Sequence, residues 1–239
     1  MGISKDFERL LRSAKQSGCV FERTLTISKL ADKNGRDASW LWRELKAARV
    51  DSLDAGDYEG ANIVHDLNNP LPVNFNGLYD AVIEGGTLEH VFNFPTAIKT
   101  AMELVKPGGR IFMVTPTNNY CGHGFYQFSP ELFFRIFSPD NGFKVERMII
   151  YRLGPLSRWY EVSDPNDIRC RTQLISYTFT DLMVQALKTE TKEIFRQWPQ
   201  QGLYAADWKG KSWQPEKLSP LGFHLHHSFL NRKLFKKIK

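Results

Sequence analysis

The sequence predicts an α/β fold in which a mostly parallel sheet is covered by helices on both faces. Short apolar runs alternate with segments of helical periodicity along the first 190 residues. The clearest unit is 79–116, where an apolar strand, a polar loop, a helix, a glycine-containing turn and a second apolar strand follow one another. A strand-helix-strand crossover of this kind belongs to a parallel sheet. Such sheets bind ligands at the carboxyl ends of their strands.

The remaining strands and helices follow from the same reasoning. Apolar and β-branched runs predict a seven-stranded sheet, with strands at 24–27, 50–54, 61–65, 79–83, 111–115, 143–151 and 181–188. Apolar residues at helical spacing, together with start and stop signals, predict helices at 5–17, 38–48, 95–105 and 130–137. Because the strands read as continuous apolar runs, helices are expected on both faces of the sheet.

Size and composition are those of an ordinary globular domain. The chain has 239 residues, of which 42% are hydrophobic, and no apolar run approaches the roughly 20 residues needed to cross a bilayer. The N-terminus lacks the apolar centre of a signal peptide, so a cytoplasmic location is expected. The three cysteines are widely spaced, which argues against a disulfide framework.

The charge of the chain is concentrated at its C-terminus. The formal net charge is +6, and much of the excess lies in 231–239. A solvated tail is the favoured interpretation, since the interior charges are mixed in sign and show no nucleic-acid face. The last fifty residues combine tryptophans, histidines and basic residues with little periodicity. We therefore expect a main domain over 1–190 and an appendage over 191–239, which could serve as a lid, a cover for the sheet edge or a homo-oligomer contact.

Two parts of the central unit resemble a known family. They are YDAVIEGGTLEHV, with an acid-His pair after the strand, and LVKPGGRIFMVTP, with a Lys-Pro-Gly-Gly turn before the next strand. Together they resemble the middle of a class I S-adenosylmethionine (SAM)-dependent methyltransferase of the type 11 kind. The similarity extends back to Val50 and covers roughly half of the chain. It implies a Rossmann-like, doubly wound fold and SAM as cofactor.

The resemblance also implies residues for the ribose and adenine of the cofactor. An acid ends the second strand of the family, and Asp54 is the better candidate here, with Asp51 in reserve. After the third strand, Asp66 would face the adenine amine and Leu67 its ring. The alternative is that these aspartates cap strand ends or form turns, as aspartate commonly does.

The glycine-rich first motif of the family is degenerate. After the first strand the chain reads SKLADKNG, with a single glycine in eight residues. One glycine cannot supply the usual close backbone turn. Lys29 could instead pair with the cofactor carboxylate, and Gly85 and Gly86 could allow close approach from the other side.

Two histidines are the candidates for catalysis. His90 follows the fourth strand, and His123 lies in a glycine-flanked polar loop after the fifth. Histidine suits a general base because its unperturbed pKa lies near neutrality. Glu84 and Glu89 are alternatives, with Glu89 more suited to orienting a neighbour. No close ligand spacing is present, so no metal is expected.

These observations favour an active O-methyltransferase with a small or sugar-like acceptor. The acceptor class follows from the uncharged polar loop around His123. The first alternative is a catalytically inactive methyltransferase-like protein that binds a partner or ligand. The degenerate glycine-rich motif supports this alternative. The second is N-methylation of a protein or nucleic acid, which only the basic tail favours.

Overall fold

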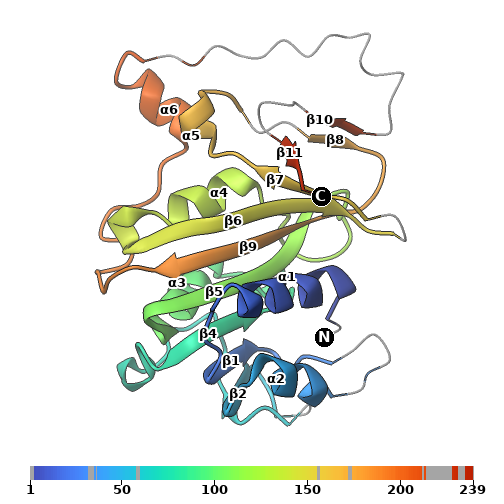
Figure 1. Ribbon diagram of the computed structural model, residues 1–239. Helices are drawn as coiled ribbons and strands as arrows, with labels where there is room; N and C mark the ends of the chain where they lie inside the picture. The colour runs from blue at the N-terminus through green and yellow to red at the C-terminus, as the bar shows by residue number, and fades with distance from the viewer. Residues whose placement is uncertain are drawn as a thin grey trace.

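The computed structural model (Figure 1) describes residues 3–31, 35, 37–57, 60–154, 157–171, 174–211, 213, 228–230 and 235–238. The strands that were predicted from the sequence are β1 (Arg23–Ile27), β2 (Arg49–Asp54), β3 (Ile63–Val64), β4 (Tyr79–Glu84), β5 (Val105–Asn118), β6 (Phe143–Arg152) and β9 (Thr180–Lys188). Four short strands were not predicted, namely β7 (Trp159–Val162), β8 (Leu174–Ser176), β10 (Ser228–Leu230) and β11 (Phe235–Lys237).

The helices lie between these strands. They are α1 (Lys5–Gln16), α2 (Ser39–Leu45), α3 (Phe94–Leu104), α4 (Pro130–Ile136), α5 (Pro165–Ile168) and α6 (Gly202–Asp207), with 3₁₀ turns η1 (Val73–Phe75), η2 (Leu88–His90) and η3 (Pro139–Asn141). The second helix is shorter than the predicted 38–48, because Lys46 adopts a left-handed conformation (φ 56°) that ends it. None of the described helices is long and apolar enough to cross a bilayer.

Nine strands form one sheet in the order β11-β7-β6-β9-β5-β4-β1-β2-β3. β1 pairs in parallel with β2 and β4, and β4 pairs in parallel with β5. Val82 lies opposite Ile111 and Ile83 opposite Phe112, which confirms that the two central strands are parallel neighbours. β9 lies antiparallel between β5 and β6. The fold is thus mostly parallel, as predicted, with two more strands than the predicted seven.

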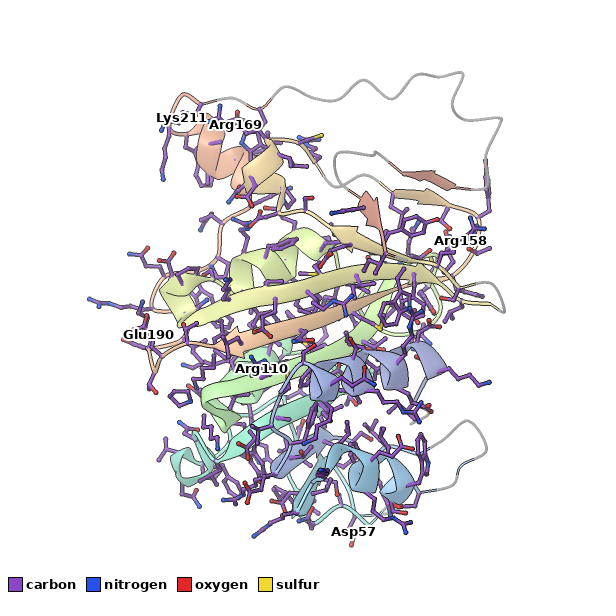
Figure 2. The ribbon with its side chains drawn as sticks, in the orientation of Figure 1. Asp57, Arg110, Arg158, Arg169, Glu190 and Lys211 are labelled. Carbon is purple, nitrogen blue, oxygen red and sulfur yellow. The ribbon has the colours of Figure 1, made fainter. Side chains whose placement is uncertain are left out.

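Helices cover both faces of this sheet (Figure 1). Alternate residues of β5 point to opposite faces, as a strand requires. Ile111 and Met113 join the core beneath α3 and α4, whereas Phe112 and Val114 join the core beneath α1 and α2. Side chains fill the space between the sheet and both helical layers (Figure 2). This double covering explains why the strands read as apolar runs.

The far edge of the sheet is built from two separate parts of the chain. β7 belongs to the segment between β6 and β9, and β11 comes from the end of the chain and pairs antiparallel with β7. β10 likewise pairs with β8 of that segment. Part of the predicted 191–239 appendage therefore extends the main sheet and its neighbouring strand pair.

Candidate functional site

A cavity of about 380 Å³ opens where β4, β5 and β6 end and β9 begins. Gly85 and Gly86 lie at its edge directly after β4, and Thr115 and Pro116 come from the end of β5. The register explains this convergence, since Glu84 lies opposite both Ile27 of β1 and Met113 of β5. Parallel strands end at one edge of the sheet, and this is where ligands bind in such folds.

Both predicted histidines line this cavity. His90 belongs to η2, and His123 to the loop that follows β5. Their ring centroids are 5.0 Å apart. The loop is held against η2 by backbone hydrogen bonds from Phe125 and Tyr126 to the carbonyl of Glu89, at 2.9 and 3.2 Å. The structure therefore brings together the two residues that the sequence placed on separate loops.

Gly124 makes this close approach possible. A Cβ atom built at this position would lie 2.8 Å from the carbonyl oxygen of Glu89 and 3.2 Å from Nδ1 of His90. Real Cβ atoms do not approach backbone this closely, so a larger residue would push the loop away. The glycine beside His123 is thus required by packing against η2.

Glu89 completes a cluster with the histidines. Its side chain is 1% exposed, and its Oε1 lies 3.5 Å from Nε2 of His123. The pKa of Glu89 is raised to about 8, mainly by burial and to a smaller extent by the negative charge of Glu84. A carboxyl group with a raised pKa keeps its proton near neutral pH, which suits Glu89 to orient the His123 ring beside it rather than to accept a proton.

The neighbouring Glu84 is completely buried at the end of β4. Burial raises its pKa to about 7, although hydrogen bonds from the backbone N–H groups of Gly86, Thr87 and Leu88 act in the opposite direction. Its Oε1 accepts these bonds, and its Oε2 is buried without a hydrogen-bond partner in the described part of the chain. Glu84 therefore holds η2 in place and is not in the cavity lining.

A second buried acid faces the histidines from the start of β9. Asp181 accepts hydrogen bonds from the hydroxyls of Tyr120 and Tyr151, the latter at 3.0 Å. Burial raises the pKa of Asp181 and of both tyrosines. The hydroxyl of Tyr151 also lies 3.2 Å from Oγ of Ser4, at the start of α1.

None of Asp181, Tyr120 and Tyr151 was predicted from the sequence as a site residue. One signal was present, since Asp181 is the one acidic residue of β9, a strand that is buried along almost its whole length. The cavity thus has carboxyl, imidazole and phenol groups in its lining, and none of its lining residues is Lys or Arg. An anionic acceptor would meet no fixed positive charge here other than a protonated histidine.

The residues expected at the ribose and adenine lie along the same sheet edge, on the far side of β1. Asp54 ends β2, and its Oδ2 accepts a hydrogen bond of 2.8 Å from the hydroxyl of Ser28. Asp66 is exposed and accepts hydrogen bonds from the backbone and side chain of Asn68. Neither aspartate is in the lining of the cavity that contains Gly85 and Gly86.

Three further candidates are also outside the lining of this cavity. Asp51, the reserve for the ribose, is 2% exposed and bonded to the side chains of Asn62 and Tyr79. Leu67 is 5% exposed and packs in the main core. The Nζ atom of Lys29 lies beside Gly60 of the β2–β3 loop, 3.6 Å from where a Cβ would stand, and Lys29 does not line the cavity.

The loop after β1 packs against the loop that follows β4. A Cβ atom built on Gly85 would lie 2.5 Å from Cδ2 of Leu30, so the leucine packs directly on the glycine. The hydroxyl of Thr87 donates a 3.3 Å hydrogen bond to the carbonyl of Ile27. These contacts occupy the place where the family would have its glycine-rich turn.

This contact predicts a coupled effect on stability. Gly85→Ala should lower the free energy of unfolding by about 1–3 kcal/mol, because the methyl group overlaps Leu30. In a Leu30→Ala background, the same change should leave the free energy of unfolding nearly unchanged. Gly122→Ala is the control, since a Cβ at Gly122 meets no atom within 4 Å. Urea denaturation of the four variants measures the coupling, and equal losses in both backgrounds would contradict the contact.

The polar side chains at this edge of the sheet fit the nucleoside part of a cofactor. Asp54 and Asp66 stand at adjacent strand ends, where a ribose and an adenine could be read. The described part of the loop after β1 does not supply the backbone approach expected for the amino-acid end of the cofactor. A carboxylate oxygen of Glu89 and one ring nitrogen each of His90 and His123 lie within 4.8 Å of one another. This cluster is compact enough to hold a cation as well as to transfer a proton.

No protein-family model matches the chain, and no curated protein is similar enough to count as a relative. Among solved structures, the MccD protein is 10% identical with a TM-score of 0.51, over 80% of this chain and 100% of that one. A SAM-dependent methyltransferase from Aquifex aeolicus is 13% identical with a TM-score of 0.47, over 77% and 89%. The N-methyltransferase NodS from Bradyrhizobium japonicum WM9, with S-adenosylhomocysteine, is 14% identical with a TM-score of 0.47, over 78% and 87%.

At these identities a likeness concerns the fold alone. The strand order and the antiparallel β9 between β5 and β6 are those of a class I methyltransferase fold.

Proposed function

We propose that the protein is a SAM-dependent methyltransferase that methylates a hydroxyl group of a small acceptor. The observation that supports this most is the cavity at the ends of β4 and β5, where two histidines and a buried glutamate converge. When bound, SAM supplies an electrophilic methyl group, and the protein positions the acceptor for in-line displacement. The acceptor is neutral or cationic, because two acidic residues and no Lys or Arg line the cavity.

In this proposal His123 removes the proton of the acceptor hydroxyl. Its ring faces the cavity and is 47% exposed, so an acceptor can reach it. Burial and the neighbouring His123 lower the pKa of His90, which disfavours its protonated form. Glu89 lies 3.5 Å from Nε2 of His123 and orients its ring. Asp181, Tyr120 and Tyr151 form the opposite wall of the cavity. Their carboxyl and hydroxyl groups can form hydrogen bonds with the methyl acceptor.

One observation favours a non-catalytic protein of the same fold. The contacts of Leu30 and Thr87 close the crevice after β1, and a cofactor would have to displace them. Calorimetric titration with SAM and S-adenosylhomocysteine separates the two candidates. Saturable binding of both, with methyl transfer to hydroxylated acceptors, supports the enzyme. Absence of binding by the wild-type protein supports the non-catalytic alternative and removes SAM as cofactor.

The ribose assignment gives a separate prediction. Asp54→Ala should weaken SAM binding by about 1.5–3 kcal/mol, because a carboxylate that accepts ribose hydroxyl hydrogen bonds is lost. Asp57→Ala is a matched control, since Asp57 is an exposed aspartate three positions further along the same chain segment. Calorimetry of both variants measures the difference. If Asp54→Ala binds as tightly as Asp57→Ala, Asp54 does not belong to the cofactor site.

A further inference from the structure

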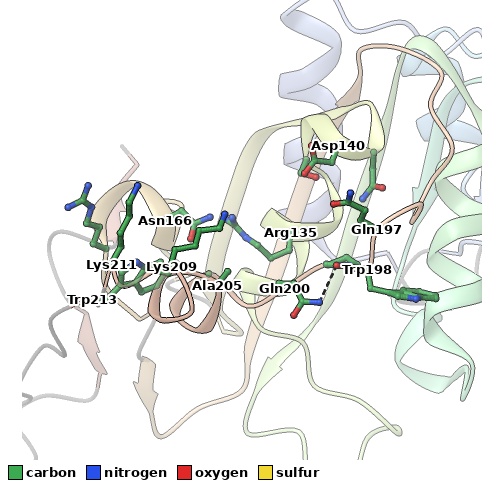
Figure 3. A pocket seen from close by; sticks show the side chains of 16 residues that line it. Arg135, Asp140, Asn166, Gln197, Trp198, Gln200, Ala205, Lys209, Lys211 and Trp213 are labelled. Atoms are coloured by element: carbon green, nitrogen blue, oxygen red, sulfur yellow. Dashed lines mark hydrogen bonds between the residues drawn. The ribbon is translucent and has the colours of Figure 1, made fainter.

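A second cavity, of about 540 Å³, lies away from the methyl-transfer site (Figure 3). Its walls come from α4, η3, α5, α6 and the segment 197–200. Asn141, one of its lining residues, stands just before β6 begins, whereas the first cavity contains the end of that strand. The two cavities therefore lie at opposite ends of the sheet. This one contains tryptophans and basic residues of the C-terminal part that the proposed function leaves unused.

The charge of this cavity is strongly one-sided. Its cationic lining residues are Arg135, Arg169, Lys209 and Lys211, and Asp140 is its one acidic lining residue. Arg135 is already paired with Asp164 and, at 3.5 Å, with Glu131. Within the described residues, no ion pair is formed by the other three cations. Their charge is therefore not neutralised by any residue in the described part of the chain.

The side chains are arranged around a common space. Figure 3 shows the ends of Arg135 and Lys209 directed toward Asn166. Arg169 and Lys211 lie together at the outer end of the same region (Figure 2). The side chains of Gln197 and Gln200 are also among the lining residues. Guanidinium, ammonium and amide donors that face one space are the groups that bind phosphoryl oxygens.

From this arrangement we propose that the cavity binds a small phosphorylated molecule, with Arg169, Lys209 and Lys211 around its phosphate. The volume lies within the range of small-molecule sites. Walls on several sides favour a compact soluble ligand over a flat lipid surface or a nucleic-acid strand. The site is independent of the methyl donor, since none of these residues lines the first cavity.

Calorimetric titration with inorganic pyrophosphate tests the site. We expect saturable binding that weakens as sodium chloride is raised, because the contacts are exposed charge pairs. Lys209→Gln/Lys211→Gln should bind about 10- to 100-fold more weakly, as hydrogen bonds to charged groups are lost. The matched control is Lys46→Gln/Lys144→Gln, which removes two exposed lysines elsewhere and should change the affinity by less than about twofold.

Saturating S-adenosylhomocysteine should leave the pyrophosphate affinity unchanged. The proposal is overturned if pyrophosphate does not bind, if both double variants lose affinity equally, or if S-adenosylhomocysteine competes. Competition would mean that pyrophosphate occupies the methyl-donor site. Because the readout is pyrophosphate binding alone, its result does not depend on whether the protein transfers methyl groups.

Discussion

Replacing His123 with asparagine is expected to lower turnover by about 10²–10⁴-fold, while the affinity for SAM stays nearly unchanged. His123 lines the cavity with its ring beside Glu89, and asparagine keeps the polar contact without the ability to accept a proton. Steady-state kinetics measure turnover, and calorimetry measures SAM binding. The pH profile of the variant should also lose the limb that reflects deprotonation of the general base.

His90→Asn is the control for this assignment, because His90 lies 5.0 Å from His123, centroid to centroid. The His90→Asn variant should retain most of the wild-type turnover. A large loss in His90→Asn with wild-type turnover in His123→Asn would transfer the role to His90. Treatment with a chelator should leave the wild-type rate unchanged. If a chelator abolishes activity and added magnesium restores it, the Glu89 cluster holds a metal and the proton-transfer role is wrong.

Replacing Asp51 with alanine is expected to lower the free energy of unfolding by about 2–4 kcal/mol. Asp51 accepts hydrogen bonds from Asn62 at 2.7 Å and from the buried hydroxyl of Tyr79 at 3.0 Å. It also pairs with Arg49 at 3.0 Å. The variant leaves the Tyr79 hydroxyl buried without this acceptor. Urea denaturation measures the loss, with the exposed Asp57→Ala as control.

The pH dependence of stability provides a second readout for Asp51. Burial acts to raise its pKa, but hydrogen bonds from Arg49, Asn62 and Tyr79 outweigh it and bring the pKa below the ordinary 3.8. The stabilisation is therefore fully present above about pH 4 and is lost as the pH falls through the lower folded-state pKa. Asp51→Ala should show a flatter decline below pH 4. Unchanged stability together with lost SAM binding would instead make Asp51 the ribose acid.

The central elements were predictable because their signals are local. The 79–116 unit shows apolar runs, a helical repeat and a glycine turn in unbroken succession, and β4, α3 and β5 form there. β3 was predicted as five residues but pairs over two, Ile63 and Val64, at the end of the parallel sheet. The segment between β6 and β9 was not predicted, since its strands are short and are stabilised by pairing with distant residues such as Phe235.

The candidate site was predictable only in outline. His90 and His123 were identified because each follows a strand that could be recognised from the sequence. Asp181, Tyr120 and Tyr151 were not, because their meeting depends on β9 lying between β5 and β6. No local pattern encodes which strands become neighbours.

The sequence by itself determined the class of fold, the two loops that contain His90 and His123, and the absence of a glycine-rich turn after the first strand. These are properties of short segments, which depend on hydrophobic periodicity and backbone freedom. Only the tertiary structure decided that Asp51 is a buried structural acid and that Leu30 covers Gly85. It also decided that Glu89 and Asp181 face the histidines, and that a cationic cavity forms at the other end of the sheet. Burial and pKa depend on neighbours far away in the chain, and folding alone brings these neighbours together.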